Sequence, residues 1–229
     1  MKNTTLKKST IAFAILLIGI VLSPTFPALP ASSNNTSRSF ETQFSTDNMV
    51  LTVQETAGSL RLHISLNSFL TENIAIEGAV YQRIVLPDES SLLLEGKPEL
   101  PVISRSIIIP DDASMQVRIL DATYTDYEHI AAAPSKGNLP RTINPDDIPY
   151  QFDNLYTKDQ WFPEQIASLS EPYILRDFRG QTIMLTPVQY NPVKKTLRFY
   201  TDISLEIYSE GLSQTNVLSR SGPPTTINT

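Results

Sequence analysis

Few residues in this sequence could do chemistry. The chain of 229 residues has no cysteine and two histidines, His63 and His129, which lie far apart. Without cysteine there is no disulfide, no thiolate metal ligand and no cysteine nucleophile. No zinc-protease, serine-hydrolase, phosphate-loop or dinucleotide motif occurs in the chain. We therefore predict that the chain is not an enzyme and that both histidines are surface or strand-filling residues.

Two acidic pairs are the remaining candidates for metal chemistry. Asp111 and Asp112, and likewise Asp146 and Asp147, could offer oxygen ligands to calcium. Each pair directly follows a proline, and aspartate is a common turn residue. We interpret both pairs as turns and predict no metal and no cofactor, with calcium as the alternative.

The longest irregular stretch is the other place where function could lie. Residues 131–149 contain four prolines, few large apolar side chains and no periodicity. Long irregular insertions in a compact domain are usually functional or disordered. Their only basic residues are Lys136 and Arg141, and Gly137 allows the backbone to approach a partner closely.

We expect the rest of the domain to consist mainly of strands, which would hold this loop in position. Apolar and polar residues alternate in several segments, which is typical of strands with one buried face, and 17 prolines disfavour long helices. We predict only one short helix, beginning at Pro163. We expect strands over residues 49–54, 60–66, 79–86, 102–109, 115–120 and 123–130. The predicted core includes Leu62, Ile64, Val117, Ile183, Leu185, Phe199 and Leu205.

Residues 173–208 organise the rest of the chain. Residues 181–190 are mostly apolar β-formers, and the Asn191-Pro192 step ends this run at a turn. Alternation then resumes, with a slip near residue 201 that predicts a β-bulge or a break. The fold we predict is all-β: an antiparallel β-sandwich with little helix and one long irregular loop, with a β-barrel as the alternative.

Three blocks of sequence resemble the propeptide of gingipain-type cysteine peptidases, peptidase family C25. They are GKPELPVISRSIIIP from residue 96, YTKDQWFP from residue 156, and RGQTIMLTPVQYNP from residue 179. One departure is that Asp177 and Phe178 separate Arg176 from the Arg-Gly step. The matching residues are Gly96, Pro98, Leu100, Pro101, Arg179, Gly180, Pro187, Tyr190, Asn191 and Pro192. We interpret Arg179 and Gly180 as structural, since glycine allows a positive φ or a close backbone approach.

The resemblance implies a non-catalytic propeptide that covers the active-site cleft of a gingipain-type peptidase until it is removed, and that assists folding. The partner would be that catalytic domain, in the same precursor or as a separate chain. The resemblance also implies that a basic loop residue enters the specificity pocket; Lys136 is the first candidate, Arg141 the second and Lys158 a distant third. Two alternatives are a truncated N-terminal piece of a peptidase precursor and a free-standing secreted binding or adhesion module.

The ends of the chain indicate export. Basic residues precede an apolar run over residues 11–22, which is too short to cross a bilayer of roughly 30 Å and is typical of a secretory signal. An uncleaved anchor is the alternative. The net charge of −6 argues against a nucleic-acid partner. We divide the chain into a signal peptide (1–31), a flexible leader (32–48), the β-domain (49–209) and a disordered tail or linker (210–229), and expect a secreted or cell-surface location without a stable membrane span.

Overall fold

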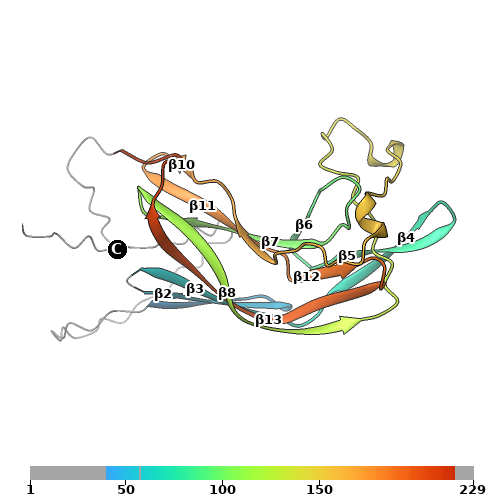
Figure 1. Cartoon of the computed structure of the whole chain (residues 1–229), viewed down its shortest axis with the longest axis horizontal. Coiled ribbons are helices and arrows are strands. Elements are labelled where there is room, and N and C mark those ends of the chain that lie inside the picture. Colours follow the sequence, from blue (N-terminus) through green and yellow to red (C-terminus); the bar gives the residue numbers. More distant parts are fainter. Residues whose placement is uncertain (1–39, 57, 220–229) are drawn as a thin grey trace, which may run out of the picture.

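Two antiparallel β-sheets face each other in this protein, and a separate β-hairpin lies at one end (Figure 1). The computed structural model describes residues 40–56 and 58–219, so the predicted signal peptide lies outside the described residues. Within them, no helix is long and apolar enough to cross a membrane. The sheets do not close into a barrel. The predicted antiparallel sandwich is therefore confirmed.

The larger sheet is built around its last strand, β13 (Thr196–Leu212). One edge of β13 pairs with β12 and then with β3, and the other edge pairs with β8. The other strands of this sheet are β1 (Phe40–Ser45), β2 (Met49–Glu55), β3 (Ser59–Leu66), β8 (Ala113–Tyr127) and β12 (Val188–Asn191).

The smaller sheet is centred on β11 (Phe178–Leu185), which pairs with β7 on one edge and with β9 and β10 on the other. Its other strands are β6 (Ser90–Ser91), β7 (Pro101–Ile108), β9 (Ala167–Leu169) and β10 (Tyr173–Leu175). The hairpin is formed by β4 (Leu70–Ile76) and β5 (Ala79–Val85), and the described helices are two short 3-10 turns, η1 (Pro145–Asp147) and η2 (Asn154–Thr157).

The core fills the space between the two sheets. Leu205 on β13 lies opposite Leu62 on β3, and both are buried together with Ile183 and Leu185 from the smaller sheet. Six of the seven predicted core residues are buried, and Val117 is half-buried against the same cluster. The predicted slip is also present, because the register between β13 and β8 shifts between Tyr200 and Asp202.

The apolar run over residues 181–190 differs from expectation. It is two strands in two different sheets: β11 ends at Leu185, and β12 begins at Val188. Pro187 lies at the crossing, where it needs no amide, and its carbonyl accepts a hydrogen bond from the Tyr200 amide at 2.9 Å. From the sequence, β11 and β12 look like one continuous strand, because most residues of both strands are buried.

Three local predictions are corrected. β1 lies inside the expected flexible leader; its residues 41–45 are exposed, so backbone pairing with β2 holds it without any apolar alternation. The expected β-domain ends at 209, but its last strand, β13, continues to Leu212. No helix begins at Pro163, because the preceding Phe162 exchanges backbone hydrogen bonds with Tyr190 (3.0 and 2.8 Å) and the chain then continues into β9.

Candidate functional site

The first residues of the irregular stretch, 131–135, are not part of a loop. Residues 131–135 run extended between β5 and residues 96–99. Ala133 donates its amide to Gln82 of β5 at 2.8 Å, and Ser135 donates to Lys97 at 2.8 Å. Residues 132–135 are buried. They form a fixed stem, and the displayed loop, residues 136–149, projects from it.

Two tyrosines tie the stem to the sandwich. The hydroxyl of Tyr156 donates to the Ala132 carbonyl, and that of Tyr190 donates to the Ile130 carbonyl, each at 3.0 Å. Burial raises the pKa of both phenols, so both remain protonated donors over the physiological range. The start of the predicted irregular stretch is therefore a hydrogen-bonded segment. Its apolar and polar residues do not alternate, because the segment has hydrogen-bond partners on both sides.

Lys136 does not project freely from the loop. Its Nζ donates to the Pro145 carbonyl at 2.7 Å and lies 4.3 Å from the centre of the Tyr150 ring. The ammonium thus joins the two arms of the loop across nine residues of sequence. Gly137 has a φ of 84°, and a Cβ there would stand 3.2 Å from the Cβ of Glu95.

Arg141 is the basic residue that the loop displays. It is exposed in a tight turn closed by a 3.0 Å hydrogen bond from the Ile143 amide to the Pro140 carbonyl. Within the described part of the chain, its side chain has no hydrogen bond and no ion pair. After the turn, the Asn144 side chain accepts the Asp146 amide at 3.2 Å and caps η1, so Asp146 and Asp147 lie in a turn.

The ten residues that match the family blocks are all buried. Gly96 has a φ of 75° and approaches the backbone of Asp153, and Pro98 forms a bridge with Pro134 of the stem. Asn191 donates its amide group to Asp159 at 2.8 Å and accepts the amide of Lys194. The blocks that begin at residues 96 and 156, together with the end of the third block, therefore meet around the stem.

Arg179 and Gly180 are not part of this assembly. They begin the third block at the β10 end of β11, away from the loop and its stem (Figure 1). The guanidinium of Arg179 is fully buried and donates to four backbone carbonyl oxygens. The Arg-Gly step that begins the third block therefore lies apart from the loop of residues 136–149.

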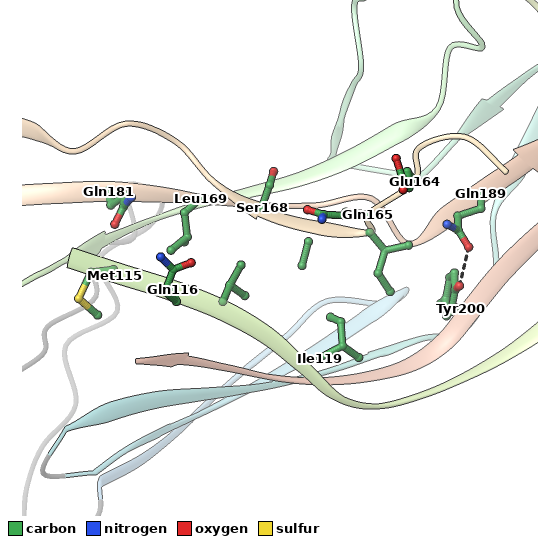
Figure 2. Close-up of a pocket in the computed structure, with 13 residues that line it drawn as sticks. Met115, Gln116, Ile119, Glu164, Gln165, Ser168, Leu169, Gln181, Gln189 and Tyr200 are labelled. Atoms are coloured by element: carbon green, nitrogen blue, oxygen red, sulfur yellow. Dashed lines mark hydrogen bonds between the residues drawn. The ribbon is translucent and has the colours of Figure 1, made fainter. Parts of the chain in front are cut away.

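A cavity of about 670 Å³ opens between β8 and the β9 segment, and it is not the loop site. Figure 2 shows Gln189 and Tyr200 at one end, joined by a 2.6 Å hydrogen bond from the Tyr200 hydroxyl, and Met115 and Gln181 at the other. Its lining consists of amides, aliphatic side chains, Met115, the hydroxyls of Ser168 and Tyr200, and the carboxylate of Glu164. Without a nucleophile next to a base, this lining has no evident catalytic chemistry.

His63 has neighbours that the sequence does not indicate. Its Nδ1 lies 3.0 Å from the Ser204 hydroxyl, its Nε2 lies 3.2 Å from the Ser65 hydroxyl, and Asp202 is 3.8 Å away. The group lies on the half-exposed outer surface of the larger sheet. His129 is exposed with a φ of 61°. In the described part of the chain, no cluster of three or more His, Asp or Glu residues could hold a metal.

Sequence reasoning missed Tyr150 and Tyr156, which brace the loop and its stem. Tyr156 begins the second block that resembles the family and Tyr150 lies outside the blocks, and the sequence predicts no bracing role for either. No periodic signal could have found them, because each contact joins residues in irregular segments.

The fold is an antiparallel β-sandwich with one exposed loop that Lys136 braces. The chain belongs to the C25 propeptide family, Propeptide_C25, whose sequence profile matches residues 42–225. The resemblance found in the sequence is thus confirmed over most of the chain.

Several gingipains of Porphyromonas gingivalis are similar to this chain. Gingipain R2 is 42% identical over 125 residues, which are 55% of this chain and 17% of that protein. Lys-gingipain is 21% identical over 189 residues, 80% of this chain and 10% of that protein. The matched part of this chain therefore spans less than a fifth of either relative.

Two solved structures share the fold. A complex of the pro- and mature domains of RgpB from P. gingivalis matches with a TM-score of 0.67 and 30% identity, covering 77% of this chain and 89% of the matched chain. A structure that addresses the zymogenic latency of gingipain K from the same organism has a TM-score of 0.63 at 18% identity. The second likeness concerns the fold alone.

Proposed function

We propose that this domain is a secreted propeptide that covers the active-site cleft of a gingipain-type cysteine peptidase, keeps it inactive and assists its folding. The observation that carries the proposal is an exposed arginine, Arg141, held on a braced loop of a propeptide-family domain. The relation to the RgpB complex supports a catalytic domain as the partner. The lack of cysteine agrees with a partner that supplies the nucleophile.

The inserted residue in this proposal is Arg141 and not Lys136. Lys136 already contacts the Pro145 carbonyl and the Tyr150 ring, so its side chain would have to break both contacts before it could enter a pocket. Arg141 has no such contact to lose within the described residues, and a turn that begins at Pro140 limits its backbone freedom. A preorganised loop loses little entropy when it docks, which favours tight binding.

Titration of a gingipain-type catalytic domain with purified variants tests this function. Arg141→Ala should weaken inhibition by about 2–5 kcal/mol, the usual cost of truncating one member of a buried charge pair. Arg176→Ala is the matched control, because Arg176 is an exposed arginine on the turn between β10 and β11 at the other end of the molecule. An Arg141→Ala loss below about 0.5 kcal/mol, the scale of a surface change, contradicts the role of the loop.

Export is the other part of the proposal. Lys2, Lys7 and Lys8 followed by the apolar run over residues 11–22 support a cleaved secretory signal and an extracellular or cell-surface location. N-terminal sequencing of exported protein should find a start between residues 30 and 34. Exported protein that retains Met1 would contradict cleavage.

A further inference from the structure

A single buried cation holds the C-terminal segment of the domain in place. Four of the five side-chain N–H groups of Arg179 donate hydrogen bonds, and all four acceptors are backbone carbonyl oxygens. Nη1 donates to Pro110 and Ala113 (2.9 and 2.7 Å), which flank the turn between β7 and β8. Nε donates to Asn216 and Nη2 to Thr215 (2.7 and 2.9 Å), which follow β13.

The turn between β7 and β8 also accepts hydrogen bonds from two backbone amides of residues 213–218. Ser213 donates its amide to the Asp112 carbonyl at 2.7 Å, and Leu218 donates to the Asp111 carbonyl at 2.9 Å. Residues 213–218 thus lie along the β7–β8 turn, fastened at both ends by amides and in the middle by the guanidinium. This order lies within the stretch expected to be a disordered tail.

Asn216 shapes the middle of the segment. It has a φ of 48°, in the left-handed region that asparagine tolerates better than most residues, and its side-chain amide donates to the Pro172 carbonyl at 2.7 Å. Residues 214–217 are exposed and 213 and 218 are half-buried, so little apolar surface holds them. Hydrogen bonds therefore account for most of their attachment.

We propose that Arg179 is a docking clamp for residues 213–218, fixing the path by which the chain leaves the sandwich, and that this segment detaches as a unit while the sandwich stays folded. Without the guanidinium, the Asn216 carbonyl loses the hydrogen bond from Arg179, and the Thr215 carbonyl keeps only the 3.2 Å hydrogen bond from the Ser213 hydroxyl, so the docked position of the segment is weakened. Detachment moves the start of any following tether from residue 219 back to residue 213, by roughly 20 Å of extended chain. A longer tether lowers the effective concentration of anything joined to it.

The clamp lies at the β10 end of the molecule, and the displayed loop lies at the other end (Figure 1). This inference goes beyond the proposed function and stands without it, because its test needs no peptidase.

Amide hydrogen exchange of the purified chain tests the clamp. Asn216→Ala loses both the left-handed preference and the bond to Pro172, whereas Asn216→Gly keeps the backbone freedom and loses only the bond. We expect exchange at Ser213 and Leu218 to accelerate by at least about tenfold in Asn216→Ala and less in Asn216→Gly. The Leu205 amide, within the core of β13, should keep its wild-type rate in both.

Arg179→Lys tests the guanidinium directly, because lysine keeps the charge but cannot reach four carbonyls with a planar fork. It should accelerate the same two amides by at least as much as Asn216→Ala. Gln214→Ala is the control, since Gln214 is exposed and makes no side-chain hydrogen bond to the described residues. If Arg179→Lys does not fold, the two Asn216 variants decide. Unchanged exchange at Ser213 and Leu218 in Asn216→Ala, or equal acceleration at Leu205, overturns the proposal.

Discussion

The ring of Tyr173 occupies the space in which Gly180 would carry a side chain. A Cβ on Gly180 would stand 2.6 Å from Cε2 and 2.8 Å from Cζ of that ring, closer than real Cβ contacts. The two residues are paired across β10 and β11. Gly180 is thus needed for close packing and not for a left-handed backbone. Of the two explanations open from the sequence, the structure selects the close approach.

Gly180→Ala should destabilise the domain by about 1–3 kcal/mol, because the added methyl group must displace the Tyr173 ring or separate β10 from β11. Equilibrium urea unfolding measures the change. In a Tyr173→Ala background the same substitution should cost less than about 0.5 kcal/mol, since the obstacle is gone. Equal costs in the two backgrounds would show that the ring is not the obstacle.

Leu205→Ala should lower the free energy of unfolding by about 2–5 kcal/mol, because Leu205 has no exposed surface and its truncation leaves a cavity between the sheets. Leu212, on the same strand, is 78% exposed and provides the matched control. Leu212→Ala should change stability by no more than about 0.5 kcal/mol. A Leu205→Ala midpoint equal to that of Leu212→Ala would mean that the inward face of β13 is misassigned.

Glu206 makes stability depend on pH. The residue is 4% exposed. Its carboxylate accepts hydrogen bonds from Arg118 (Nε at 2.9 Å), Ser59 (2.9 Å) and Arg61 (3.1 Å), and these contacts hold its pKa below the ordinary value. A lowered folded-state pKa means stabilisation that is complete above the unfolded pKa and lost as pH falls through the folded pKa.

Glu206→Gln should therefore destabilise the domain at pH 7, and the difference from the wild type should shrink as pH falls below about 4. Urea midpoints measured from pH 7 to pH 3 test this, with the exposed Glu210→Gln as control. A difference that is constant over the whole range would exclude the linkage.

Lys136→Met should loosen the loop, because methionine keeps an apolar stem but cannot donate to Pro145. Limited trypsin digestion reports loop opening as cleavage after Arg141, followed by mass spectrometry. We expect that cleavage to accelerate by about 3–10-fold, corresponding to one lost hydrogen bond. Lys158→Met, at an exposed lysine outside the loop, should leave the rate unchanged. Cleavage at the wild-type rate in Lys136→Met would show that Lys136 does not brace the loop.

Much of the sandwich can be predicted from the sequence, because residues such as Leu62 and Leu205 alternate with polar neighbours along half-buried strands. Where that pattern is missing, prediction fails for physical reasons. Residues 41–45 of β1 are all exposed and show no buried face, and the run over residues 181–190 is mostly buried in both sheets that it joins.

The displayed loop could be located from the sequence but its geometry could not. Prolines and the lack of periodicity mark residues 131–149, and Lys136 and Arg141 stand out as its only cations. Which cation is free depends on the carbonyl of Pro145 and the ring of Tyr150, which are brought to Lys136 only by the folded loop.

The position of β13 also determines when the domain can fold. It is the last strand of the described chain, yet it joins β3, β8 and β12, and its Glu206 meets Ser59 from 147 residues away. During synthesis the earlier strands of the larger sheet must wait for it, with the free edges of β3 and β8 unpaired. Such non-local pairing places folding in the slow range of milliseconds to seconds. The N-terminal half is therefore the part most exposed to mispairing before the chain is complete.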